Sequence, residues 1–326
     1  PWESIRQFER QGLRWFCRHD PEARKRTEEE IILDIDSTCD PTHGQQHLSF
    51  FNGHYDTHMY HPLFIFEGHS GILLASCLRP GDVGGIRQLL PLLRPTVREL
   101  RGRFPKRPIA LRGDADFAKP DLLDYAEYAG CTYAFGMARN RKLEACIEGL
   151  RKRAEEKWKL SGERVRLYTS FFYKTQSWGR ARRMAAKVEY TALGVNVRFV
   201  VTNRRGSAKE IFDWYEQRGQ AENFIKELKR DVAADRLSCS AYHANAFRLQ
   251  LHGLAYNLLV LFRRRLLPGT QLATATIDSL RLRLLKAGAR VCRSVRRLWF
   301  HLASGWPGQP LFQLVLERLA LVRGPT

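Results

Sequence analysis

Short apolar runs bounded by glycine, proline and charged residues recur through the first 140 residues of the chain. A run of this kind predicts a buried strand, whereas leucine or valine at every third or fourth position predicts a helix. The predicted strands are 31–36, 48–52, 59–67, 71–78, 108–111 and 131–136. The predicted helices are 86–101 and 121–129. This order of elements predicts an α/β fold, in which a mixed sheet is flanked by helices.

The pattern changes after residue 138. A charged helical stretch at 144–159 is followed by strand-like stretches at 164–174, 186–191 and 195–202, which together predict a basic, β-rich insertion. Beyond the insertion, spacing of apolar residues predicts three further helices, at 207–231, 245–266 and 276–300.

These changes divide the chain into four regions. We expect residues 31–138 and 207–266 to form the core around the insertion at 139–206, with a basic helical C-terminal region at 267–326. The chain begins with proline rather than methionine, so we expect residues 1–30 to be the remnant of a truncated N-terminal region.

Positive charge is concentrated in two segments. The 326 residues carry 54 lysines and arginines against 34 acidic residues, a formal net charge of +20. Residues 139–190 hold fifteen basic against six acidic residues, and residues 263–300 hold ten against one. Either segment alone is typical of a solvated face, but the two together favour nucleic acid as the partner, because neutralised phosphates release counterions. A membrane surface is less favoured, since these segments lack the apolar face of an interfacial helix.

The cysteines and the apolar runs indicate the cellular setting. The seven cysteines form no C-x-x-C pair, which favours a reducing cytoplasm over a disulfide scaffold or a structural zinc site. No apolar run approaches the ~20 residues that a bilayer span requires. We therefore expect a cytoplasmic protein with no membrane partner.

Acidic residues end two of the predicted strands. Asp36 ends the strand at 31–36 and shares a face with Asp34, because strand side chains alternate. Asp114 follows the strand at 108–111. Acids at such positions cap turns in many proteins, but at the ends of neighbouring strands they can also converge on Mg²⁺, which prefers oxygen ligands.

The predicted helix at 207–231 contains four polar residues at helical spacing. Tyr215, Arg218, Glu222 and Lys229 fall within an arc of about 60° if the helix is continuous. One carboxylate is thereby placed among two cations and a phenol, which suits a metal ion beside a phosphodiester. The alternative is a solvated stripe of intrahelical ion pairs.

The spacing Tyr-x2-Arg-x3-Glu-x6-Lys resembles the Y-R-E-K signature of DDE-type transposases of bacterial insertion sequences, and the resemblance to their DDE domain group 1 extends from about residue 30 to the end. The other matching stretches are Leu33-Asp34-Ile35-Asp36-Ser37-Thr38, Asp40-Pro41-Thr42-His43-Gly44-Gln45-Gln46, Phe50-Phe51-Asn52-Gly53-His54-Tyr55, Leu78-Arg79-Pro80-Gly81, Arg112-Gly113-Asp114 and Leu282-Arg283-Leu284-Leu285-Lys286.

The resemblance implies an RNase H-like core and a triad of catalytic, metal-binding acids. Asp36 matches the first acid because Ser37-Thr38 follows it, Asp114 matches the second, and Glu222 matches the third. The resemblance implies two Mg²⁺ or Mn²⁺ ions per active site. It also implies phosphoryl transfer that cleaves the end of the insertion sequence, forms a DNA hairpin and joins the element to target DNA. Implied partners are double-stranded DNA and a second copy in a paired-end complex, in the bacterial nucleoid.

Further DNA contacts are predicted outside the triad. The resemblance implies that Tyr215, Arg218 and Lys229 contact phosphates. Within the insertion, we consider two roles for Trp178. It could stack on an unpaired base, or it could be an ordinary packing residue. The basic residues near Trp178 that we expect to contact DNA are Arg180, Arg182 and Arg183. Two other functions stay open, a non-catalytic DNA-binding derivative of a transposase and an RNase H-like nuclease that cleaves branched DNA.

Overall fold

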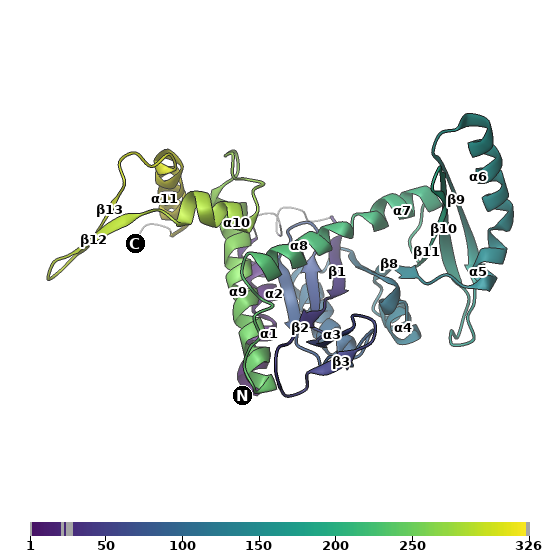
Figure 1. The fold of residues 1–326 in the computed structure, drawn as a ribbon, viewed down its shortest axis with the longest axis horizontal. Coiled ribbons are helices and arrows are strands. Elements are labelled where there is room, and N and C mark those ends of the chain that lie inside the picture. Colours follow the sequence, from purple (N-terminus) through teal and green to yellow (C-terminus); the bar gives the residue numbers. More distant parts are fainter. Residues whose placement is uncertain (1, 21–22, 24–28, 324–326) are drawn as a thin grey trace.

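The computed structural model describes residues 2–20, 23 and 29–323. Eight strands form one mixed sheet in the order β6-β5-β1-β7-β8-β11-β10-β9 (Figure 1). The neighbours β1, β7 and β8 run parallel, and every other pair is antiparallel. The strands are β1 (Ile31–Ser37), β5 (Leu63–Glu67), β6 (Leu73–Cys77), β7 (Ile109–Gly113), β8 (Thr132–Met137), β9 (Val165–Tyr173), β10 (Arg182–Thr191) and β11 (Gly194–Thr202). The expected mixed sheet flanked by helices is confirmed.

Helices from both ends of the chain cover the β6 edge. The strand β6 contacts α2 (Gln11–His19), α3 (Leu89–Arg103) and α9 (Tyr242–Leu266), and α1 (Trp2–Glu9) packs against α9. Leu13 and Phe16 of α2 are buried in the main core. The N-terminal segment expected to be a remnant is therefore part of the core as far as residue 20. Helix α4 (Pro120–Tyr128) covers β8.

The stretch 59–67, predicted as one strand, is two. The strand β4 (Thr57–Tyr60) pairs with β2 (Asp40–Pro41) and β3 (Phe50–Asn52) in a small separate sheet, and β5 belongs to the main sheet. The break falls at His61-Pro62, because proline cannot donate a backbone hydrogen bond to a strand ladder.

The basic insertion extends the core sheet. Its helices are α5 (Arg141–Cys146) and α6 (Glu148–Ser161), and its strands are β9, β10 and β11. Strand β11 pairs with β8 through Thr202 and Ala134, so the ladder is continuous from core to insertion. Helix α6 packs on β9 and β10. Helix α7 (Ala208–Glu216) packs on β8, β9 and β10 and shares a small core with Ala185 of β10 and Val200 of β11. The strands expected to interrupt the core thus share its hydrogen-bonding network.

The single helix predicted at 207–231 is wrong. Helix α7 ends at Glu216, and α8 spans Gly219–Arg230. Between them Arg218 N–H donates to the Tyr215 carbonyl, an i to i−3 bond that tightens the turn. Gly219 has low helix propensity, and α7 packs on β8–β10 whereas α8 packs on β1. Tyr215 therefore lies on a different helix from Glu222.

The arginine-rich helix predicted at 276–300 is also wrong. A short helix, α10 (Ile277–Leu280), and a π-helical turn (Arg281–Leu285) lead into a β-hairpin of β12 (Ala289–Arg293) and β13 (Leu298–Leu302). Valine and aromatic residues, which favour strands, follow Gly288 here. The chain then continues into α11 (Gln309–Arg323). No helix in the described part of the chain is long and apolar enough to cross a membrane.

A row of paired residues across the sheet supports α7 and α8. Phe66, Asp34, Arg112 and Ala134 are register partners on β5, β1, β7 and β8 and share one face. Arg112 donates two hydrogen bonds to the Asp34 carboxylate, at 2.6 and 2.8 Å, with both side chains buried.

The two helices dock on this row by different contacts. On α7, the Arg112 guanidinium lies over the Trp214 ring, 4.9 Å from its centroid, and donates to the Trp214 carbonyl. On α8, the Phe224 ring contacts Phe66 at 5.6 Å. The sheet thereby fixes both ends of the α7–α8 junction.

We expect Arg112→Met to destabilise the fold by roughly 3–5 kcal/mol, because it leaves the Asp34 carboxylate buried without its cation. The double variant Asp34→Leu/Arg112→Met should recover most of this loss, since no buried charge remains. Urea unfolding of both variants measures the difference. Lys209→Met, which removes an exposed ion pair with Asp213, is the control and should cost less than about 0.5 kcal/mol. Equal losses in the single and double variants would contradict this account.

Candidate active site

Asp36 and Asp114 lie side by side at the carboxyl ends of two adjacent parallel strands. Ile35 of β1 pairs with Gly113 of β7, and each acid is the next residue along its strand. The Asp36 side chain accepts a hydrogen bond from the Ser37 N–H, and Asp114 caps a short 3₁₀ turn by accepting from the Asp116 N–H. The carboxyl edge of parallel strands is where open α/β sheets hold ligands.

Asp34 and Asp36 have different partners, although both side chains lie on the same face of the sheet. Asp34 is fully engaged by Arg112 inside the core. Asp36 sits two residues closer to the sheet edge, and its nearest cation is Arg218, at 3.8 Å between Oδ2 and Nη2. Asp34 thus has a structural environment, and Asp36 belongs to the edge cluster.

The turn between α7 and α8 brings Arg218 and Glu222 to this edge. Arg218 Nη1 lies 3.5 Å from Glu222 Oε1, so the guanidinium sits between Glu222 and Asp36. Glu222 occupies the first turn of α8 and has a largely exposed side chain. The three acids predicted from sequence are therefore gathered around one arginine, two from strand ends and one from a helix.

Electrostatic coupling within this cluster is strong. Burial raises the pKa of Asp36 to about 7; Arg218 opposes this shift, whereas the charges of Asp114 and Glu222 add to it. Burial also raises the pKa of Asp114. Burial opposes ionisation of Arg218, but Tyr215 and the charges of all three acids raise the pKa of its guanidinium. One positive charge thus faces three carboxylates, which leaves a net negative site.

The donor chemistry of this cluster fits a hard divalent cation. Carboxylate oxygens are the ligands that Mg²⁺ and Mn²⁺ prefer, and a second positive charge would offset both the burial of Asp36, which is the main cause of its raised pKa, and the smaller repulsion from Asp114 and Glu222. Among residues 2–20, 23 and 29–323, however, no three metal-ligating side chains stand close enough to share one ion. The acids are arranged around Arg218, so metal binding requires them to draw closer together.

Tyr215 and Lys229, the other two signature residues, are oriented differently from the prediction. Tyr215 is buried in the small core beneath α7, and its hydroxyl lies against Gly136, where a methyl group would come within 2.7 Å of it. Lys229 Nζ donates to the Cys39 carbonyl at 2.6 Å and so ties α8 to the loop after β1. Tyr215 departs from the arc predicted for the four side chains because the helix breaks at Gln217 and Arg218, whereas Arg218, Glu222 and Lys229 stay on α8 or at its N-cap.

Trp178 is a packing residue in this structure. Its side chain is only 3% exposed, its ring contacts Tyr173, and the Arg182 guanidinium lies over it at 5.3 Å. An unpaired base has no access to a ring so enclosed. Arg182 is itself buried and pairs with Glu127 and Asp124, so neither side chain is presented to DNA as the sequence led us to expect.

The other two arginines of this segment line a groove of about 660 Å³ beside β8 and β11. Arg180 is exposed and pairs with Glu127. Arg183 donates to the Arg204 and Gly206 carbonyls. Exposed Arg205 lines the same groove. This basic groove is a second surface where polyanion contacts are possible, apart from the acid cluster.

Tyr55 was not singled out from sequence but lies near the acids. It is 40% exposed at the tip between β3 and β4, and its ring contacts His61 at 5.8 Å. Burial raises the pKa of Tyr55, and the charges of Cys39, Asp116, Asp36 and Asp114 raise it further. The sequence signal was the aromatic stretch Phe50-Phe51-Asn52-Gly53-His54-Tyr55, which by itself indicates no site.

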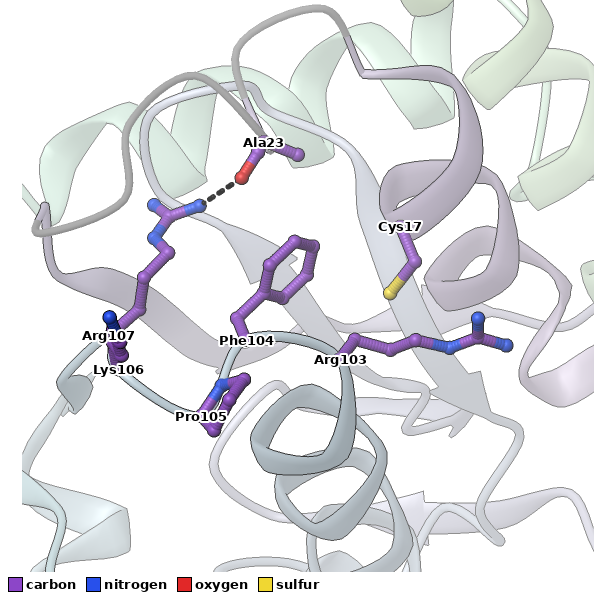
Figure 2. Close-up of a pocket in the computed structure, with 7 residues that line it drawn as sticks. All are labelled: Cys17, Ala23, Arg103, Phe104, Pro105, Lys106 and Arg107. Carbon is purple, nitrogen blue, oxygen red and sulfur yellow. Dashed lines mark hydrogen bonds between the residues drawn. The ribbon is translucent and has the colours of Figure 1, made fainter.

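A further hollow lies apart from the acid cluster. A cavity of about 420 Å³ lies between the end of α3 and the N-terminal segment, and Figure 2 shows the residues that line it. It is lined by Cys17, Ala23, Arg103, Phe104, Pro105, Lys106 and Arg107. None of the three acids borders it, so it is separate from the candidate active site.

The fold and the site define an α/β protein with an acidic cluster at the carboxyl edge of parallel strands. The model of the family Transposase DDE domain group 1 matches residues 7–324. The chain belongs to this family. Comparison with curated proteins finds no match.

A cryo-EM structure of the piggyBac transposase synaptic complex with hairpin DNA is similar to this chain. The two share 12% sequence identity with a TM-score of 0.47, and the match covers 77% of this chain. The chain spans about half the length of that transposase, since the match covers 51% of it.

We expect Asp36→Asn to stabilise the metal-free protein, and more so at higher pH. A carboxyl whose pKa rises from 3.8 to about 7 on folding loses stability as pH increases from about 4 to about 7, because the unfolded chain ionises first. The increase in the free energy of unfolding caused by Asp36→Asn should be larger at pH 8 than at pH 5, by roughly 2 kcal/mol. Denaturant unfolding in EDTA measures it. Exposed Asp82→Asn is the control, and a gain independent of pH would refute the electrostatic origin.

Proposed function

We propose that this chain is the catalytic part of a metal-dependent DNA transposase that moves an insertion sequence by cutting and pasting. The observation that carries the proposal is the convergence of Asp36, Asp114 and Glu222 on Arg218, in a chain that belongs to a transposase family. The order β6-β5-β1-β7-β8, with the first acid on the central strand, also supports an RNase H-like core.

We assign metal binding and catalysis to Asp36, Asp114 and Glu222. Two Mg²⁺ or Mn²⁺ ions, when bound, would supply Lewis-acid stabilisation of phosphoryl oxygens and lower the pKa of an attacking hydroxyl. Asp36 is electrostatically coupled to both of the other acids, so it would be the acid best suited to share a cation with either of them. Glu222 is the most exposed of the three, so it is the acid that can move with least loss of packing.

The remaining residues position substrate and charge. Arg218 offsets the repulsion among the acids and stands where a phosphodiester would approach. Lys229 holds α8 against the loop after β1, which keeps Glu222 beside the sheet edge. Tyr55 is placed to contact the nucleotide next to the reacting phosphate through its exposed ring. Phosphoryl transfer depends mainly on such positioning and needs no covalent intermediate on the protein.

The proposed substrates are transposon-end and target duplexes, with end cleavage, a DNA hairpin and strand transfer as successive reactions. The net charge of +20 supports a polyanionic partner. Because the chain belongs to a transposase family, we also propose that two copies join in a paired-end complex and that the protein associates with the bacterial nucleoid.

Glu222→Gln should reduce Mg²⁺-dependent strand cleavage at least 100-fold and leave the fold intact, because a neutral amide binds the cation poorly at an exposed position. The assay follows nicking of end-bearing duplex on denaturing gels, with a random duplex beside it. Asp213→Asn, an exposed acid on α7, is the matched control and should retain activity. Undiminished cleavage by Glu222→Gln would remove this residue from the mechanism, and equal cleavage of both duplexes would favour a nuclease.

Arg218→Gln should tighten Mn²⁺ binding about tenfold in the absence of DNA, because the three carboxylates lose the cation that now faces them. Titration calorimetry with MnCl₂ alone measures this affinity without any reaction. Lys226→Gln removes an exposed charge from the same helix and should change the affinity little. Weaker Mn²⁺ binding by Arg218→Gln would show that the guanidinium organises the acids for the metal instead of occupying its place.

A further inference from the structure

The hairpin of β12 and β13 projects from the body of the protein beside α11 (Figure 1). Apart from each other, the two strands make no extensive contact with another described element. Its large side chains are exposed, among them Leu298 at 60% and Phe300 at 66%. An isolated two-stranded hairpin is marginally stable in water, so a bound partner would stabilise this one.

The register gives the hairpin two different faces. Val291 and Phe300 are direct partners on an apolar face, which they share with Ala289 and Leu302. The opposite face pairs Arg290 with His301 and Cys292 with Trp299. Arg297 extends this second face, because its guanidinium lies over the Trp299 ring at 5.9 Å. The last pair, Arg293 with Leu298, falls on the first face. That face is therefore apolar except for Arg293, and the other is basic and aromatic.

The charge of the hairpin is uncompensated. From residue 279 to residue 316 the sequence contains seven lysines and arginines and no acid. The hairpin arginines 290, 293, 296 and 297 are all exposed, and none of them forms an ion pair within 4.0 Å in the part of the chain that the structure describes. A second copy of the chain would bring these like charges together, whereas a polyanion complements them.

We propose that this hairpin binds duplex DNA by inserting its basic, aromatic face into the major groove. The B-DNA major groove, about 12 Å wide, admits a two-stranded β-ribbon. Arg290, Arg297 and His301 then face the base edges, and Arg293 and Arg296 near the tip reach the flanking phosphates. The proposal rests on the proposed function in taking DNA as the partner, and it assigns a segment and a groove to that contact.

Fluorescence anisotropy with a random 30-base-pair duplex in EDTA tests the proposal between 50 and 200 mM NaCl. Arg290→Gln/Arg297→Gln should weaken binding at least tenfold, because two base-edge contacts are lost, and Arg293→Gln/Arg296→Gln should reduce the slope of log K against log salt by about two, one for each lost phosphate contact. Dimethyl sulfate, which methylates guanine N7 in the major groove, should show protection by the wild-type chain that Arg290→Gln/Arg297→Gln loses. Arg98→Gln/Lys106→Gln removes two exposed charges elsewhere and should retain both the slope and the protection.

Wild-type affinity in Arg290→Gln/Arg297→Gln together with a wild-type salt slope in Arg293→Gln/Arg296→Gln would overturn the proposal. Loss of a dimer in Phe300→Ser by light scattering, with DNA binding unchanged, would also overturn it and identify the hairpin as a self-association element. The two proposals fail separately. If Glu222→Gln still cleaves DNA but DNA binding depends on the β12–β13 hairpin, only the catalytic assignment fails. If cleavage behaves as proposed but substitutions in the β12–β13 hairpin leave DNA binding unchanged, only the hairpin assignment fails.

Discussion

The Arg112 guanidinium closes a bidentate pair with Asp34 and at the same time lies over Trp214 of α7, at the centre of the sheet face. Removing either charged partner would leave the other buried without compensation, so the contact tolerates little displacement. Because Trp214 is only four residues before Arg218, this contact also sets where the α7–α8 turn falls. The positions of Arg218 and Glu222 relative to Asp36 therefore depend on a pair of residues that take no part in the acid cluster itself.

The acid cluster gains its character from incomplete compensation. Asp34 has a full partner in Arg112, whereas Asp36, Asp114 and Glu222 share the single charge of Arg218. Burial without full neutralisation raises the pKa of Asp36 to about 7 and makes the site a favourable place for an added cation. Two aspartates separated by one residue on the same strand thus differ in environment because only Asp34 has an arginine to itself.

Much of the fold follows from the pattern of apolar residues. Apart from the stretch 59–67, the core strands and the helices α3, α4 and α9 were predicted to within a few residues, because a buried strand or an amphipathic helix is encoded by nearby side chains. The two incorrect helices have a common cause. Helical spacing continues through Gly219 and through the segment after Leu285, and only docking of α7 and α8 on different strands, or pairing of β12 with β13, ends it. Neither contact is local in sequence.

The sequence by itself determined the mixed sheet and the concentration of positive charge and singled out three candidate acids, since each depends on residue type and short-range spacing. Tertiary structure decided which groups face one another. It placed Trp178 and Arg182 in the core, divided the signature residues between two helices, and brought Tyr55 near the acids. The reason is physical: burial and electrostatic coupling depend on distances between segments that lie far apart in the chain, and those distances are set by how the helices pack on the sheet.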